Sequence, residues 1–170
     1  YSFPALDNRK LYYSTAGDFG DQWELKYYAL DRRTGDVEWV YTDMSNWGGY
    51  PHAEFEPRRM FDQNLDLLDY LAPSLWRDKV IYTSGDTVVR AFNTGSSGLA
   101  WTRQLRSVTT IAPTVAGDRV YFGIAADPYP GGKGPELIVL SARDGSVMWG
   151  LELEGDLLSA IGLFDLEPAG

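Results

Sequence analysis

Two short sequence patterns each occur three times, in the same order, along this 170-residue chain. The first begins with proline, places an aliphatic residue two positions later, and continues through a polar turn to Lys or Arg, two apolar residues and an aromatic residue. Its copies are residues 4–13, 73–82 and 113–122. Each copy predicts two short strands around a tight turn, with proline at the start of the first strand, where its missing N–H costs least.

The second pattern is a hairpin that ends in tryptophan. Its copies, residues 28–39, 90–101 and 138–149, each predict a strand, a turn that contains glycine and a second strand. The middle copy has its last turn glycine one position closer to the tryptophan, so we expect that turn to differ in detail. Two hairpins per repeat give four antiparallel strands, which is the composition of one β-propeller blade.

The order of these hairpins predicts an all-β chain of three four-stranded antiparallel propeller blades and the first strand of a fourth. The chain is then a single partial propeller domain. We expect blade one at about 2–42, an insertion with a short helix at 43–70, blade two at about 71–104, blade three at about 111–152 and the start of blade four at about 158–165. Because propellers close with about four to eight blades, we expect self-association, for example as a symmetric dimer, or further blades in a longer chain.

The tryptophan hairpins resemble the repeat of pyrroloquinoline-quinone-type (PQQ-type, quinoprotein-like) β-propellers. The first hairpin has Ala-x-Asp at 29–31, followed by Gly35 and Trp39. The hairpins at 90–101 and 138–149 match it with Asn and Ser in place of Asp. The family includes quinone-dependent dehydrogenases and many proteins that bind no quinone, so the resemblance does not itself imply catalysis. It does imply an exported setting, either periplasmic or extracellular.

Trp39, Trp101 and Trp149 recur at one position of the repeat. A residue required in every blade is typical of architecture rather than of a ligand site, and a tryptophan can bury a large area while its indole N–H donates a hydrogen bond. The resemblance implies that these three side chains dock between neighbouring blades, on the backbone of the next blade. The recurrent polar residues of the turns (Asp31, Asn93 and Ser141) are expected to accept backbone N–H bonds.

Three long insertions fall at the same end of the predicted blades. Strands alternate in direction, so the first and third connections of a blade share one end, and the second connection shares the other end with the link to the next blade. The insertions at 15–23, 43–70 and 125–135 belong to the second end. Loops on a rigid scaffold commonly carry binding, so we expect the functional surface there. Its candidate ligand-contacting residues are Trp23, Trp47, Tyr50, His52 and Tyr129.

Composition excludes several classes of function. The chain carries a formal net charge of −9, which disfavours nucleic acid and anionic membrane surfaces as partners. It contains no cysteine, which excludes disulfides, thiol nucleophiles and Cys-ligated zinc. No apolar run of about 18 residues occurs, so no membrane insertion is expected.

The sequence offers no catalytic set and no metal-binding pattern. His52 is the only histidine, and the glycine-rich stretch 131–134 lacks the spacing of a phosphate-binding loop. The favoured function is therefore a non-catalytic scaffold that binds a protein, a peptide or a glycan, with no cofactor. The alternative is a fragment of a quinone-dependent alcohol or sugar dehydrogenase, which would use PQQ with calcium. The absence of cysteine removes the vicinal disulfide that several such enzymes place beside the quinone.

Overall fold

The computed structural model contains only β-strands as regular elements within the residues it describes. These residues are 4–18, 23–45, 72–84, 86–127, 130–155 and 161. The strands form three four-stranded sheets, and every pair of neighbouring strands is antiparallel. Within the described part of the chain, no helix is long and apolar enough to cross a membrane.

Each sheet is built from strands that are consecutive in the sequence. The first blade contains β1 (Ala5–Leu6), β2 (Lys10–Asp18), β3 (Trp23–Asp31) and β4 (Val37–Ser45). The second contains β5 (Ser74–Trp76), β6 (Lys79–Thr83), β7 (Val88–Asn93) and β8 (Leu99–Gln104). The third contains β9 (Thr114–Ala116), β10 (Arg119–Ile124), β11 (Glu136–Ser141) and β12 (Val147–Glu152).

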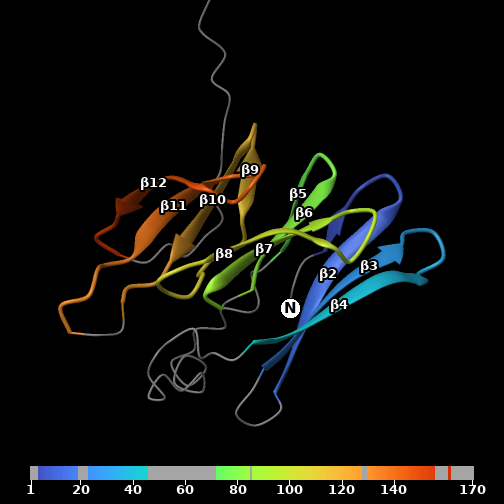
Figure 1. Ribbon diagram of the computed structural model, residues 1–170, viewed down its shortest axis with the longest axis horizontal. Coiled ribbons are helices and arrows are strands. Elements are labelled where there is room, and N and C mark those ends of the chain that lie inside the picture. The colour runs from blue at the N-terminus through green and yellow to red at the C-terminus, as the bar shows by residue number, and fades with distance from the viewer. Residues whose placement is uncertain are drawn as a thin grey trace, which may run out of the picture.

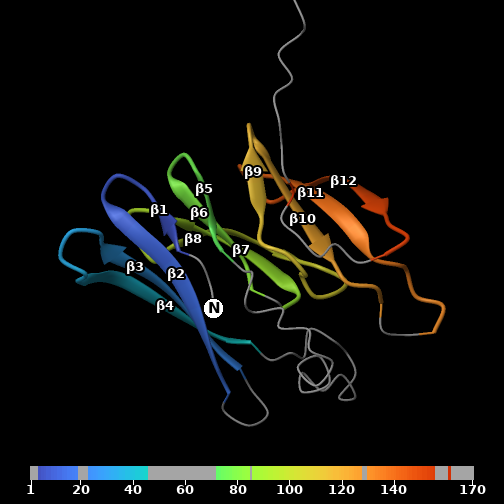
Figure 2. The same cartoon turned by 180° about the vertical axis from the view of Figure 1, so that it is seen from behind.

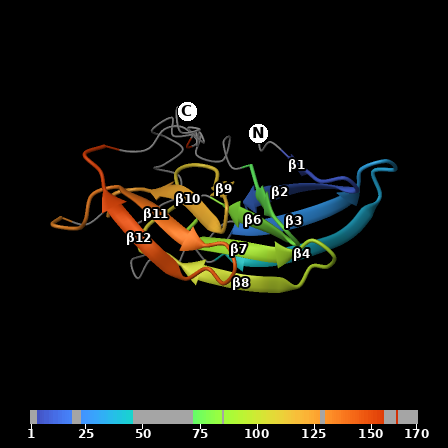
Figure 3. The same cartoon turned by 90° about the horizontal axis from the view of Figure 1, so that it is seen from above.

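The three sheets stand side by side in chain order, as neighbouring blades of a propeller do. Figure 1 shows the first blade at one end of the row, the second in the middle and the third at the other end. The reverse view and the view from above show the same order (Figure 2, Figure 3). The prediction of three four-stranded antiparallel propeller blades is therefore confirmed.

Three sequence predictions concern the segments between and after the blades. The predicted insertion at 15–23 is largely wrong, because β2 and β3 stay paired as far as Asp18 and Trp23, which satisfies their backbone groups. The helix predicted within 43–70 lies outside the described residues. The same holds for the fourth-blade strand at 158–165, apart from Ile161, whose carbonyl accepts a hydrogen bond from Thr114 Oγ1 at 3.0 Å.

A β-bulge precedes the tryptophan in every blade. In the first blade Ala29 pairs with Trp39, but the next residue, Leu30, pairs with Val37, so Glu38 is left over. The same register shift occurs at the equivalent pairs of the second and third blades. A bulge re-aims the side chains around it and increases the local twist. Because the bulge recurs at the same register position, it places the tryptophan equivalently in each blade.

The first two tryptophans dock on the backbone of the next blade. Trp39 Nε1 donates to the carbonyl of Thr94 at 3.3 Å, and Trp101 Nε1 donates to the carbonyl of Ala142 at 3.1 Å. Thr94 and Ala142 are equivalent, since each is the first residue after the third strand of its blade. Only 8% of Trp39 and 9% of Trp101 is exposed, against 44% of Trp149, which has no described blade beyond it.

The turn between the third and fourth strands is shaped by a left-handed glycine in two of the blades. Gly35 has φ of 79° and Gly145 has φ of 70°. At Gly145 an added Cβ would lie 2.5 Å from Cε3 of Trp101, which no real contact tolerates, whereas at Gly35 it would meet nothing within 4 Å. Gly145 therefore serves both the turn and the close approach of the docked indole.

The polar residues that open these turns act in two ways. Asp31 Oδ1 accepts the backbone N–H groups of Arg33 and Thr34 at 2.8 and 2.9 Å, as the sequence predicts. In the second blade the Asn93 amide instead donates to the carbonyl of Gly98 at 3.3 Å. The different turn predicted from the shifted glycine is thus accompanied by a reversed hydrogen bond.

Two apolar clusters hold the blades together. The cluster between the first and second blades is rich in aromatic side chains. Its buried members are Tyr12, Leu25, Tyr27, Ala29, Trp39, Val80, Tyr82 and Phe92. The cluster between the second and third blades is mainly aliphatic and includes Ile81, Val89, Trp101, Phe122 and Leu140. Because each cluster takes side chains from two blades, the core of this chain lies between its sheets.

Substituting the two left-handed glycines separates the strain of the turn from the contact with Trp101. Gly35→Ala should cost about 1–2 kcal/mol, the penalty of a left-handed backbone for a residue with a Cβ. Gly145→Ala should cost about 1–3 kcal/mol more, because its Cβ also overpacks against the indole. Urea unfolding of both variants at the same low protein concentration measures the difference, and equal losses would contradict the docking argument.

Candidate functional site

Buried polar side chains gather at one end of the blades. This end carries the connections between second and third strands and the links between blades. The buried polar residues are Thr83, Ser84, Asp86, Thr87, Arg90, Ser107, Thr109 and Thr110. It is the end at which the sequence places the functional surface, and we call it the loop end.

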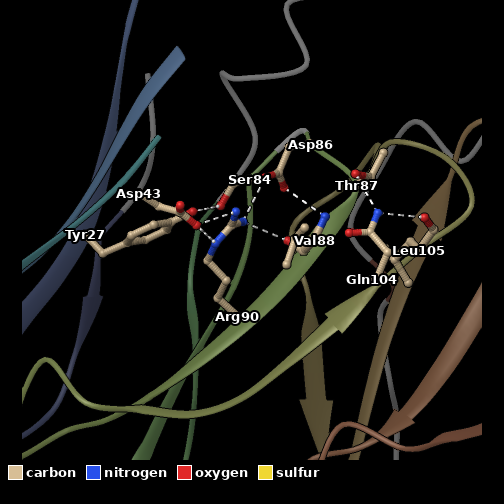
Figure 4. Close-up of polar contacts among 9 residues, drawn as sticks. All are labelled: Tyr27, Asp43, Ser84, Asp86, Thr87, Val88, Arg90, Gln104 and Leu105. Carbon is tan, nitrogen blue, oxygen red and sulfur yellow. Dashed lines mark hydrogen bonds and ion pairs between the residues drawn. The ribbon is translucent and has the colours of Figure 1, made fainter. Parts of the chain in front are cut away.

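A buried arginine connects the first and second blades at the loop end (Figure 4). Arg90, in β7, is only 3% exposed. Its Nη1 donates to Asp86 Oδ2 at 2.8 Å and to the carbonyl of Val88 at 3.1 Å. Its Nε lies 2.9 Å and its Nη2 2.8 Å from Asp43 Oδ2, on β4 of the first blade. One guanidinium therefore joins two carboxylates that belong to different blades.

Asp86 is the carboxylate that depends most on this arginine. Its side chain is 4% exposed, and its Oδ1 accepts the backbone N–H of Val88 at 3.1 Å. Burial raises the pKa of Asp86, and the charge of Arg90 opposes that rise. Removal of the guanidinium would therefore leave a buried carboxylate whose ionised form has lost its counter-charge.

An aromatic residue of the first blade completes the contact. Tyr27 is fully buried, and its hydroxyl lies 2.8 Å from Ser84 Oγ in the second blade. Burial raises the pKa of Tyr27 above its usual value. Figure 4 shows Tyr27 and Asp43 on one side of the Arg90 guanidinium and Asp86 on the other, with Ser84 next to the Tyr27 hydroxyl. Tyr27 is therefore a neutral hydrogen-bonding partner at neutral pH.

The hydrogen bonds continue within the second blade. The backbone N–H of Leu105 donates to the carbonyl of Thr87 at 2.8 Å, and that of Thr109 donates to the carbonyl of Asp86 at 3.0 Å. Gln104 Nε2 donates to Thr87 Oγ1 at 2.9 Å. The link that leaves β8 is thus fixed to the loop between β6 and β7.

The same link also holds the long loop of the third blade. The backbone N–H of Ala125 donates to the carbonyl of Val108 at 2.9 Å. Arg106 Nη2 donates to the carbonyl of Gly134 at 2.5 Å, and the guanidinium pairs with Glu136 at 3.3 Å. The loop that the sequence places at 125–135 lies between the ends of β10 and β11. Contacts at the loop end therefore extend from Asp43 in the first blade to Gly134 in the third.

The polar groups of this network bind one another and so hold the loops in place. Arg90 and Arg106 already hold carboxylates and backbone carbonyls, so their charges are engaged within the protein. Among the described residues, no group of three or more His, Cys, Asp or Glu side chains could hold a metal ion.

The candidate ligand-contacting residues are not brought together by the described structure. Trp23 is the first residue of β3, where its backbone pairs with Asp18 and Ser45 at the loop end. The other four, Trp47, Tyr50, His52 and Tyr129, lie outside the described residues. Their contact with a ligand stays a prediction.

Sequence reasoning missed the charged pair that dominates this end. The signal was present, because Arg90 interrupts the apolar strand Val88–Phe92 and Asp86 stands four residues before it. A charge inside a buried strand implies a buried partner. Asp43 could not have been identified in this way, since its place beside Arg90 depends on how the first two blades pack.

Comparison with known proteins identifies the family. A family model described as outer membrane protein assembly factor BamB matches residues 28–162, which is most of the chain. The chain belongs to this BamB family of PQQ-type propeller repeats. The matched region includes all three tryptophan hairpins. No curated protein matches the chain.

Solved structures similar to this BamB-family chain support the fold. BamB from Moraxella catarrhalis has a TM-score of 0.54 at 16% identity, covering 89% of this chain and 37% of its own. The quinohemoprotein alcohol dehydrogenase from Comamonas testosteroni has a TM-score of 0.55 at 17% identity, covering 89% of this chain and 20% of its own. The computationally designed Ika4 protein has a TM-score of 0.53 at 11% identity, with 93% and 82% covered. The chain thus spans well under half the length of the two natural proteins.

Replacing Arg90 tests the network. Arg90→Met should destabilise the fold by about 3–5 kcal/mol at pH 7, the usual cost of removing one partner of a buried ion pair. Without the guanidinium, the pKa of Asp86 in the folded variant lies further above its value in the unfolded chain. The loss of unfolding free energy should therefore be smallest near pH 4 and grow as the pH rises. Urea unfolding from pH 4 to 7 measures this slope.

The matched control is another arginine that pairs across two blades, but on the surface. Arg77 lies 3.2 Å from Asp118, and the side chains are 63% and 54% exposed. Arg77→Met should change stability by less than about 1 kcal/mol. A similar loss in both variants, or a loss at Arg90 that does not depend on pH, would show that charge burial is not the cause.

Proposed function

We propose that this chain is part of a non-catalytic propeller scaffold that binds a polypeptide partner through its loop end, in a periplasmic or extracellular setting. The observation that carries the proposal is the hydrogen-bonded network at that end, which joins loops of the second and third blades and anchors them to the first blade through Arg90. The description of the family as an outer membrane protein assembly factor supports both a protein partner and this setting.

A fixed loop surface suits recognition of another protein. Binding normally costs free energy when loops and side chains become ordered at the interface. Here the link after β8 and the loop after β10 are already held by backbone hydrogen bonds of 2.8–3.0 Å. Aromatic residues are enriched among those that dominate protein interfaces, and Trp47, Tyr50 and Tyr129 belong to the insertions at this end.

Site-specific photo-crosslinking tests which end of the blades meets the partner. A benzophenone amino acid replaces Lys133, exposed in the loop after β10, or Arg33, exposed in the turn after β3 at the opposite end. The protein is then irradiated in an envelope extract of its source. We expect a protease-sensitive adduct from position 133 and none from position 33.

A double variant links the adduct to the candidate aromatic residues. Trp47→Ala with Tyr50→Ala should abolish the adduct at position 133 and leave the unfolding curve in place. Arg143→Ala with Ser146→Ala, in a turn at the opposite end, is the control and should leave the adduct unchanged. Equal adducts from both ends, an adduct that survives the aromatic double variant, or an adduct that proteases do not degrade would overturn the proposal.

The dehydrogenase alternative has its own test. The similarity to quinohemoprotein alcohol dehydrogenase at 17% identity supports the shared fold, and this is the observation that keeps the alternative in view. Titration of the purified chain with PQQ and calcium should leave the quinone absorbance unchanged. A saturable absorbance shift, together with dye-linked oxidation of an alcohol, would instead establish the alternative.

A further inference from the structure

The loop after β10 is held by charged side chains just before β11 begins. The contacts converge on Gly134. Its carbonyl accepts a hydrogen bond from Arg106 Nη2 at 2.5 Å, and its N–H donates to Glu152 Oε1 at 3.1 Å. Arg106 belongs to the link between β8 and β9, whereas Glu152 is the last residue of β12. Both backbone polar groups of Gly134 are therefore bound by side chains from different segments.

The Arg106 side chain directs its described polar contacts to this one place. Its Nε and Nη2 each lie 3.3 Å from Glu136 Oε2, at the start of β11. Its Nη1 is buried and has no hydrogen-bond partner within the described part of the chain. A buried donor without a partner costs free energy, so the contacts of the other two nitrogens must outweigh that cost. The guanidinium therefore serves to hold Gly134 and Glu136 together.

Two carboxylates share one face of the third blade beside this arginine. Glu136 pairs with Glu152 across β11 and β12, and Gly150 lies on the same face, two residues before Glu152. Like charges directly opposite each other destabilise a sheet. Here the two carboxylates separate. Glu152 binds the N–H of Gly134, whereas the Glu136 carboxylate lies over Gly150 and reaches Arg106.

The arrangement of the Glu136 carboxylate depends on the glycine at position 150. A Cβ at Gly150 would overlap Glu136 Oε1 and lie 2.9 Å from its carboxyl carbon. Gly150 is not among the glycines with positive φ, so its backbone conformation does not itself call for glycine. The missing side chain instead provides the space from which Glu136 reaches Arg106.

The other end of the same loop is fixed through the backbone. The N–H of Ala125 donates to the carbonyl of Val108 at 2.9 Å, in the link that also carries Arg106. The N–H of Asp127 donates to the carbonyl of Lys133 at 2.8 Å, which closes the loop on itself. The segment that carries the exposed Lys133 therefore has its direction set by what happens at its two ends.

We propose that the clamp formed by Arg106, Glu136 and Glu152 positions the loop after β10 for its polypeptide partner. Gly150 is a positioning residue of the same clamp, since it makes the space that Glu136 occupies. This inference rests on the proposed function at the loop end and names residues that set the shape of that surface. A loop that is already ordered binds without the cost of ordering it, so release of the clamp weakens binding.

Amide hydrogen exchange of the purified chain tests the clamp without any partner. Gly150→Ala should speed exchange at the Gly134 amide about tenfold, the equivalent of one lost charge-assisted hydrogen bond when the loop opens. Gly95→Ala is the matched control, because an added Cβ there meets nothing within 4 Å. In a Glu136→Ala background, Gly150→Ala should have no further effect, since the carboxylate that it displaces is gone. Unchanged exchange in Gly150→Ala, or the same effect with and without Glu136, contradicts the clamp.

Photo-crosslinking from position 133 then tests the effect on the partner. Gly150→Ala should lower the adduct yield about tenfold, and Gly95→Ala should not. Glu152→Ala is a second variant, which removes the acceptor of the Gly134 N–H at an exposed position and should lower the yield similarly. Urea unfolding confirms that each variant is folded.

The outcomes separate this inference from the proposed function. Faster exchange at Gly134 with an undiminished adduct would show that the loop is clamped but not positioned for binding, and the proposed function would stand. Absence of any adduct from the wild type would remove the proposed function and this inference with it.

Discussion

The hydrogen bond from a tryptophan indole to a backbone carbonyl of the next blade is the contact on which this structure depends. It requires a bulge that aims the indole, a buried small or branched residue opposite it, and a turn whose backbone can approach the ring. These features come from two blades, since Trp101 docks where Gly145 leaves room for it. The tryptophan therefore recurs in the sequence because each blade docks on its neighbour. In a single isolated blade, a tryptophan at that position would have no neighbouring backbone to bind.

The two ends of the blades are stabilised by different kinds of interaction. At the turn end, indoles and apolar side chains exclude water, and the Trp39 and Trp101 indoles donate to backbone carbonyls of the next blade. At the loop end, Arg90 joins Asp86 and Asp43 in a buried setting, where a paired charge is tolerated and an unpaired one is expensive. Apolar side chains stay in contact when one blade shifts slightly against the next. A guanidinium that must reach two carboxylates loses its hydrogen bonds when the blades shift. The charged network therefore defines how the first blade meets the second at the face where binding is proposed.

Local pattern was enough to predict the blades, and it failed where the answer lies in a neighbouring blade. The hairpins at 28–39, 90–101 and 138–149 are set by turns and by alternation along the strand, which the sequence shows directly. The pairing of Asp43 with Arg90 depends on the packing of two sheets. The same limit explains the end of β2, where residues expected to form a loop continue as a strand because β3 offers partners for their backbone groups. For Trp149 the sequence could indicate the position but not that it would be exposed.

In such an array each blade buries its faces only against its neighbours, so stability is approximately a sum of blade and interface contributions. The two interfaces described here differ in kind. The first combines an aromatic cluster with the Arg90 network, whereas the second combines a mainly aliphatic cluster with backbone hydrogen bonds between loops. The loop end is held across both, so its geometry follows from how closely all three blades pack. A change deep between two blades would therefore alter the surface at which binding is proposed.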